Sequence, residues 1–93
     1  MTQTKRFRTR EGREVTLELF KFDTCPYCQR VFSVLDRLGL EIPMADIRRD
    51  PAALERLIAV GGKRQVPCLF IDGEPMYESA DIAAWLEDNF GQR

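Results

Sequence analysis

The sequence has no histidine, only three cysteines and no long hydrophobic run, and each absence excludes a class of protein. A structural zinc site needs four ligands, usually cysteines and histidines, so a monomer of this chain does not supply a complete set. No apolar run approaches the roughly 20 residues that a membrane-spanning helix requires. The N-terminus lacks the apolar segment of a secretory signal. We therefore expect a cytoplasmic protein that holds no metal and has no membrane partner.

The 93 residues are enough for one domain with its own hydrophobic core. Charge is unevenly distributed: residues 1–14 contain five basic and two acidic residues, a net charge of +3, whereas the whole chain has −1. Such a segment can contact nucleic acid or anionic lipid, but a solvated, poorly ordered tail is the simpler interpretation. We expect a flexible basic arm over 1–14, a folded monomeric domain over 15–93, and no nucleic-acid partner.

Two of the cysteines, Cys25 and Cys28, lie three positions apart between a strand-like run and a helical run. Pro26 suits the first turn of a helix, so Cys25 is expected at the helix N-terminus and Cys28 one turn further on the same face. The orphan N–H groups and the dipole of that terminus favour a thiolate, the form that attacks disulfides. The sequence therefore predicts thiol–disulfide exchange, with Cys25 as nucleophile and Cys28 as resolving thiol.

Turn and capping residues divide the rest of the chain into short elements. We expect strands over residues 15–22, 40–47, 68–71 and 74–77, and helices that begin near Pro26, Pro51 and Ser79. The pair Asp72-Gly73 indicates a hairpin between the last two strands, and the first strand-helix-strand unit should be a right-handed parallel crossover. The prediction is an α/β fold of order β-α-β-α-β-β-α, with a four-stranded mixed sheet and three flanking helices. Cys68, in the third strand, is most simply a small buried apolar residue, and a second redox role for it stays open.

The segment Cys25-Pro26-Tyr27-Cys28 resembles the dithiol active-site motif of the glutaredoxin family. The similarity continues in order through residues 61–67, 70–73 and 78–82 and so covers most of residues 15–90. The resemblance implies a thioredoxin fold and glutathione as cosubstrate. It implies a glutathione-dependent oxidoreductase whose partners are glutathionylated or disulfide-bonded proteins, reduced through Cys25.

The resemblance also implies roles for residues outside the motif. Pro67 matches a position whose peptide bond is cis in this fold, which would turn the backbone of Val66 toward the sulfurs and the cysteinyl part of glutathione. Ser79 and the start of the last helix would receive the γ-glutamyl carboxylate, and Ser79 is also expected to cap that helix. The other expected contacts are Glu78 or Asp81 with the γ-glutamyl ammonium, Gln65 and more loosely Lys63 or Arg64 with the glycine carboxylate, and Tyr27 beside the tripeptide.

Two features depart from the family pattern. Many small glutaredoxins have a lysine three positions before the first cysteine, where this chain has Phe22, and Lys21 should face the opposite way in a strand. The segment 76–79 is similar to the thioredoxin domain of glutathione transferases rather than to small glutaredoxins. A transferase-like conjugating domain is therefore an alternative, although the chain has no room for the helical second domain. A second alternative is a carrier of an iron–sulfur cluster held by Cys25 and glutathione. By the family resemblance, Pro26 disfavours this function.

Overall fold

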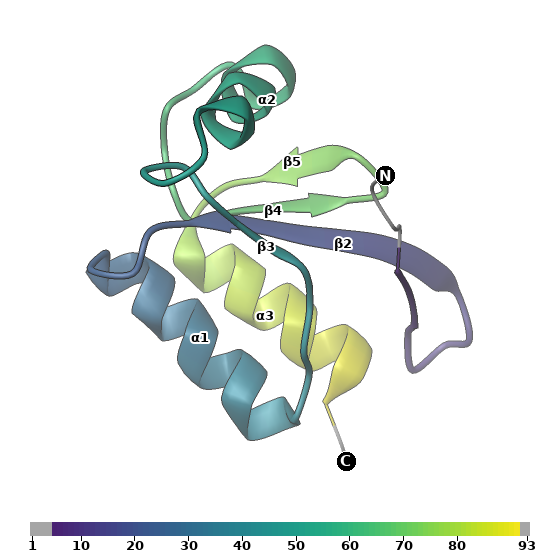
Figure 1. Cartoon of the computed structure of the whole chain (residues 1–93). Helices are drawn as coiled ribbons and strands as arrows, with labels where there is room; N and C mark the ends of the chain where they lie inside the picture. Colours follow the sequence, from purple (N-terminus) through teal and green to yellow (C-terminus); the bar gives the residue numbers. More distant parts are fainter. Residues whose placement is uncertain (1–4, 92–93) are drawn as a thin grey trace.

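The computed structural model describes residues 5–91 and contains a sheet built around one long strand, β2 (Figure 1). In chain order the elements are β1 (Arg6–Arg8), β2 (Glu14–Lys21), α1 (Pro26–Leu38), β3 (Met44–Asp46), α2 (Pro51–Gly61), β4 (Cys68–Ile71), β5 (Glu74–Met76) and α3 (Ser79–Phe90). From β2 onward this is the predicted β-α-β-α-β-β-α order, so the expected thioredoxin fold is confirmed. The strand β1 is additional.

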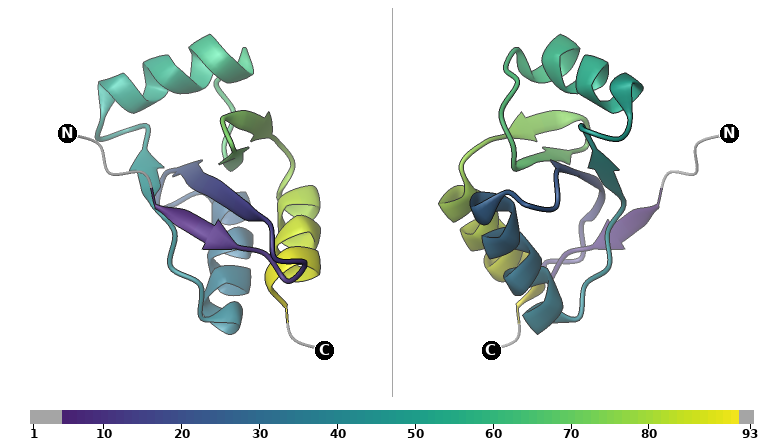
Figure 2. Two further views of the ribbon diagram at one scale, coloured as in Figure 1. Left: turned by 90° about the vertical axis from the view of Figure 1, so that its right-hand side faces the viewer. Right: turned by 60° about the vertical axis from the view of Figure 1, so that its left-hand side comes forward.

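The strand β2 pairs with three others: antiparallel with β4, parallel with β3 and antiparallel with β1. β5 extends the sheet beyond β4, so the predicted mixed sheet is present with β1 as a fifth strand (Figure 2). Asp72 and Gly73 have φ angles of 51° and 81°. These left-handed conformations are those of a type I′ hairpin turn, which therefore forms where the sequence predicted it.

Helices cover both faces of the sheet, with α1 and α3 on one face and α2 on the other (Figure 1). Because successive side chains of a strand point to opposite faces, β2 contributes to both layers. Leu17 and Leu19 pack with α1 and α3, whereas Phe20 packs with α2. Leu19 and Phe20 are both 0% exposed. The C-terminal end of β2, which leads into α1, is therefore packed between two hydrophobic cores, one on each face of the sheet.

The first two helices begin at the residues that the sequence predicted. Pro26 is the first residue of α1, with Cys25 as its N-cap, and Gly39 follows its end in the left-handed conformation. Asp50 caps α2 through a hydrogen bond from the backbone N–H of Ala52 at 3.1 Å. A proline at the first helical position costs no hydrogen bond, so both helix starts lie at defined places relative to the sheet.

Two strands are shorter than expected. β3 begins only after Pro43, because a proline has no N–H to donate to a neighbouring strand. The carbonyl of Pro43 still accepts a hydrogen bond from the N–H of Leu19 at 3.0 Å. β5 ends at Met76, and Tyr77 instead turns its hydroxyl to the carbonyl of Lys63 at 3.1 Å.

The N-terminal segment differs from the flexible basic arm expected over residues 1–14. Residues 1–4 lie outside the described part of the chain, but Arg6–Arg8 form β1 and pair with residues 14–16. Phe7 is 8% exposed and belongs to the core beneath α1 and α3. The N–H of Arg10 donates to the carbonyl of Asn89 at 2.6 Å, at the end of α3. Over residues 6–14, a hairpin packed on the core therefore takes the place of the expected arm.

Candidate functional site

Cys25 lies where β2 passes into α1 and acts as the N-cap of that helix. Its Sγ accepts a hydrogen bond from the N–H of Cys28 at 3.4 Å and lies 3.9 Å from the carbonyl oxygen of Val66. The residue is 5% exposed. The N–H groups at a helix start carry a partial positive charge, so this position stabilises negative charge on the sulfur. The Val66 backbone lies next to it.

Cys28 lies one turn further into α1 and is 0% exposed. Burial is the main cause that raises the pKa of its thiol, from 9.0 to about 12. At neutral pH Cys28 therefore carries its proton. This pair of environments, one sulfur at a helix mouth and one buried beneath it, is the arrangement that the spacing of the two cysteines predicted.

A cleft of about 710 Å³ opens beside Cys25. It is formed by the start of α1, the turn before α2, the loop before β4 and the start of α3. Its lining includes six residues that the sequence singled out for glutathione binding: Tyr27, Gln65, Val66, Pro67, Glu78 and Ser79. The Val66–Pro67 peptide bond is cis. Residues about 50 positions apart in the chain are thus brought to one cavity.

Two of the looser expectations do not fall on this cleft. Lys63 and Asp81 are absent from its lining. The ammonium of Lys63 instead lies 4.8 Å from the centre of the Tyr77 ring. Arg64 does line the cleft, so of the two basic residues in this loop only Arg64 faces the cavity.

The start of α3 differs from the expectation that Ser79 caps the helix. Glu78 occupies the N-cap position with φ 72° and makes no capping hydrogen bond through its side chain. Ser79 is the first helical residue and is 6% exposed. A residue with helical backbone cannot also be the flanking cap. The backbone N–H groups of this helix start therefore lie at the cleft, where an anion can approach them.

Two arginines that line the cleft, Arg48 in the turn between β3 and α2 and Arg30 in α1, were not predicted from the sequence. Arg48 lines the cleft, with its guanidinium 3.7 Å from the centre of the Phe22 ring. Its Nη1 donates to the hydroxyl of Thr24 at 3.4 Å. Arg30, from α1, also lines the cavity. No motif surrounds Arg48, and a charged residue in a short turn normally indicates only solvent exposure, so the sequence carried no signal for it.

The structure describes no metal-binding cluster in residues 5–91: no group of three or more histidine, cysteine, aspartate or glutamate residues is placed to hold an ion. In the same residues, no helix has the length and apolar character needed to cross a bilayer.

Cys68 lies on the opposite face of the sheet from α1. It is 0% exposed and packs in the core beneath α2 with Phe20, Leu57 and Phe70. Burial is the main cause that raises the pKa of its thiol to about 11. A protonated, enclosed thiol is a poor nucleophile, so the structure favours the apolar packing role over a second redox role.

The burial of Cys68 predicts a loss of stability at alkaline pH. Its thiol has a pKa of 9.0 when unperturbed and about 11 in the folded chain. Between these values the folded state keeps the proton that the unfolded state loses, so the free energy of unfolding falls as pH rises, by up to about 1.4 kcal/mol per pH unit. The Cys28 thiol, whose pKa burial also raises, contributes a slope of the same sign. Cys68→Ala should therefore reduce the slope without abolishing it, measured by urea unfolding under reductant at about pH 8 and about pH 10. An unchanged slope in the variant would show that Cys68 is not the group responsible.

Comparison with known proteins places this site in a family. The sequence model of one protein family, described as the glutathione S-transferase N-terminal domain, matches residues 19–93. A probable glutaredoxin from Synechocystis sp. is 36% identical over 69 residues, which are 73% of this chain and 78% of that protein. Glutaredoxin 3 of Escherichia coli is 31% identical over 68 residues, 73% of this chain and 82% of that protein.

Solved structures share the fold at similar or lower identity. A rice glutathione transferase in complex with glutathione has a TM-score of 0.67 and 29% identity, over 80% of this chain and 32% of the transferase. A trimeric glutathione transferase from Leishmania has a TM-score of 0.66 and 25% identity, over 77% of this chain. The chain spans only 16% of the length of the Leishmania protein. A thioredoxin-like protein has a TM-score of 0.61 and 27% identity, with 67% of this chain and 80% of that protein covered.

The curated relatives are matched over more than two thirds of their own length, and the structural neighbours have the same thioredoxin-like domain. The cysteine pair at the start of α1 and the cis proline before β4 are features that the resemblance to glutaredoxins implied. The chain belongs to the glutaredoxin family.

Proposed function

We propose that this chain is a glutathione-dependent thiol–disulfide oxidoreductase that reduces protein–glutathione mixed disulfides and protein disulfides. The observation that carries the proposal is the position of the Cys25 sulfur. It lies at the N-terminus of α1, 3.4 Å from the N–H of Cys28 and 3.9 Å from the Val66 carbonyl, and the residue lines an open cleft. A thiolate at this place can attack a sulfur delivered through the cleft.

The reaction with a mixed disulfide needs only Cys25. Its thiolate attacks the glutathionyl sulfur, the S–S bond breaks, and the protein thiol leaves as a thiolate that takes up a proton. The glutathionyl group is then bonded to Cys25. The thiolate of a second glutathione attacks the sulfur of this group, which restores the Cys25 thiolate and releases glutathione disulfide.

Reduction of a disulfide within a protein needs Cys28 as well. After Cys25 has formed a mixed disulfide with the substrate, the Cys28 sulfur attacks the Cys25 sulfur and passes its proton to the leaving thiolate of the substrate. A Cys25–Cys28 disulfide results, and two glutathione molecules then reduce it. The raised pKa of the Cys28 thiol keeps it from competing as the first nucleophile.

The cleft has groups that suit each part of glutathione. The backbone N–H and C=O of Val66 would pair with the cysteinyl part in the manner of a β-strand. The start of α3, at Glu78 and Ser79, would receive the γ-glutamyl carboxylate and ammonium. Gln65 would take the glycine carboxylate, and Tyr27, which is 65% exposed at the rim, would flank the tripeptide.

The test is turnover of a small glutathione mixed disulfide, with the glutathione disulfide produced coupled to glutathione reductase and followed by the loss of NADPH. We expect turnover that depends on added glutathione. The same preparation is offered glutathione and an electrophilic aromatic compound, because the match to the transferase N-terminal domain over residues 19–93 keeps conjugation as the second candidate. Conjugation without disulfide turnover would reverse the assignment.

A further inference from the structure

The guanidinium of Arg48, an exposed residue, makes two contacts at the wall of the cleft. Its central carbon lies 3.7 Å from the centre of the Phe22 ring, and one of its N–H groups donates to the Thr24 hydroxyl at 3.4 Å. Within residues 5–91 no carboxylate lies within ion-pair distance of this guanidinium. An arginine has five N–H donors, so Arg48 keeps donors for a group that enters the cleft.

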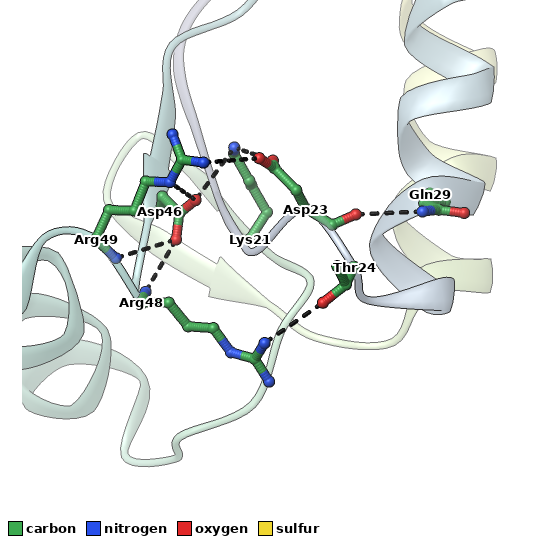
Figure 3. Close-up of polar contacts among 7 residues, drawn as sticks. All are labelled: Lys21, Asp23, Thr24, Gln29, Asp46, Arg48 and Arg49. Atoms are coloured by element: carbon green, nitrogen blue, oxygen red, sulfur yellow. Dashed lines mark hydrogen bonds and ion pairs between the residues drawn. The ribbon is translucent and has the colours of Figure 1, made fainter.

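The backbone of Arg48 is hydrogen-bonded to a carboxylate outside the cleft lining, that of Asp46 (Figure 3). Asp46 Oδ1 accepts hydrogen bonds from the backbone N–H groups of Arg48 at 2.9 Å and of Arg49 at 3.2 Å. These bonds close the turn that leads from β3 into α2. The conformation of the turn decides where the side chain of Arg48 begins, so Asp46 sets the direction from which it reaches Phe22.

The same carboxylate joins this turn to the loop that precedes Cys25. Asp46 Oδ2 lies 3.6 Å from the Nζ of Lys21, and that Nζ lies 2.6 Å from Asp23 Oδ1. The carbonyl of Asp23 accepts a hydrogen bond from the side chain of Gln29 in α1 at 3.2 Å. Figure 3 shows these groups as one network between the two loops. The side chains of Lys21 and Asp46 are only 16% and 14% exposed, so the ion pair is better shielded than a surface pair.

The charges that line the cleft indicate which kind of substrate group Arg48 can bind. Three guanidinium groups, those of Arg30, Arg48 and Arg64, line the cavity, and Glu78 is its one carboxylate within the described chain. The chain as a whole has a net charge of −1, so this local excess of positive charge is a property of the cleft. It complements a substrate with free carboxylates.

We propose that Asp46 is a positioning residue for the reaction: it holds the turn and the loop before Cys25 together so that Arg48, pressed against Phe22, receives a carboxylate of the substrate. The inference rests on the proposed function for the nature of that substrate. Asp46 itself touches neither the substrate nor the sulfur. The carboxylate belongs either to the glutathionyl group or to an acidic side chain next to the disulfide of the protein, and the experiment separates these two sources.

The first experiment measures an equilibrium and needs no turnover. In a Cys28→Ser background, Cys25 is allowed to exchange with glutathione disulfide and, separately, with the disulfide of glutathione esterified at its glycine carboxylate. With the original Asp46 and Arg48, the free acid should be favoured about tenfold, as expected for one charge-assisted hydrogen bond. Arg48→Ala should reduce this ratio to near one, and Asp46→Ala should reduce it to a similar value. Asp46→Asn, whose amide oxygen can still accept the two backbone hydrogen bonds, should lie between.

A second arm examines the protein side of the disulfide. Two short peptides are used as glutathione mixed disulfides, one with aspartate beside the cysteine and one with asparagine. If Arg48 receives the acidic side chain, the aspartate peptide should have the lower KM, and Arg48→Ala should remove the difference without a similar loss in kcat. A preference for the free acid over the ester with no difference between the peptides assigns the carboxylate to glutathione.

The matched control is Asp36→Ala, which removes an exposed carboxylate from α1 away from the cleft lining and should leave every ratio unchanged. The double variant Asp46→Ala/Arg48→Ala should lose no more discrimination than Arg48→Ala alone, because the two residues act as one unit. A merely structural role for Asp46 would lower the melting temperature and leave the ratio of acid to ester as it was.

Three results would overturn the inference. The first is a discrimination, of acid over ester or of the aspartate over the asparagine peptide, that Asp46→Ala leaves unchanged. The second is an absence of discrimination in both arms with Asp46 and Arg48 intact. The third is an Arg48→Ala variant that loses acid and ester equally, and loses the two peptides equally. The failure of the proposed function looks different. In that case Cys25 would still exchange with the expected discrimination, but the chain would show no glutathione-dependent turnover.

Discussion

Cys25→Ser is expected to reduce turnover of a glutathione mixed disulfide on the order of a thousandfold or more, the scale at which loss of a catalytic nucleophile is felt. A serine hydroxyl is not ionised at neutral pH and cannot form a disulfide. Cys28→Ser should retain turnover of the same substrate within a few-fold, because the route through a glutathionyl group on Cys25 does not use the second sulfur. Both variants are measured in the coupled assay at equal protein concentration.

The two variants should differ again on a protein disulfide. There the Cys28→Ser chain should stop at the mixed disulfide with its substrate, which non-reducing electrophoresis would detect as a trapped covalent complex. Melting curves of both variants serve as the control for folding. Loss of activity on the glutathione mixed disulfide in Cys28→Ser would contradict the single-thiol route and would show that turnover of this substrate needs Cys28 as well as Cys25.

Phe7→Ala is expected to lower the free energy of unfolding by about 3 kcal/mol, in the range measured for removal of a buried phenylalanine ring. Phe7 is 8% exposed and packs into the core between the sheet and the helices α1 and α3. The measurement is urea unfolding followed by far-ultraviolet circular dichroism. Arg8→Ala, at the exposed neighbouring position of β1, is the matched control and should change stability by less than about 0.5 kcal/mol.

The comparison tests whether the N-terminal hairpin belongs to the cooperative fold. If residues 6–14 were an arm attached to a domain that begins at residue 15, Phe7→Ala would behave like Arg8→Ala. A loss confined to Phe7 would show instead that β1 unfolds together with the core.

Most of the secondary structure can be predicted from helix-capping and turn residues, which act over a few positions of the sequence. Cys25-Pro26 and Asp50-Pro51 mark helix starts because a proline tolerates the first helical position and a small polar side chain can accept an N–H there. Asp72-Gly73 marks a hairpin because both residues tolerate positive φ. These signals depend on the residues themselves and on neighbours within four positions. The structure therefore has these elements where the sequence predicted them.

The strand β1 could not be predicted in the same way. A strand of three residues with one apolar side chain, Phe7, between Arg6 and Arg8 shows no alternation that a pattern can detect. Its stability depends on pairing with β2 and on packing of Phe7 in the core, which exist only in the folded chain. Composition alone made the segment resemble a solvated tail.

The candidate site likewise contains residues that belong to sequence motifs and residues that only tertiary contacts bring to the cleft. Cys25, Val66-Pro67 and Glu78-Ser79 belong to motifs and were predicted from the sequence, and the structure brings them to one cleft, with Cys28 buried one turn further into α1. Arg48 belongs to no motif. Its place depends on Asp46, on Phe22 and on the meeting of two loops, and none of these can be inferred from the spacing of residues along the chain. Ser79 was misplaced by one position because the cap of α3 is a residue with positive φ, Glu78, and such a cap is unusual for glutamate.

The strand β1 also has a consequence for how copies of this chain meet one another. An unpaired stretch of β2 over residues 14–16 would present free N–H and C=O groups to any extended segment of another chain, which is a common route to aggregation. β1 occupies those groups. In its turn β1 offers only a three-residue edge, with two exposed arginines at its ends, and a short edge with like charges is poorly suited to accept a further strand. The basic character of this segment therefore protects this edge of the sheet against growth by strand addition.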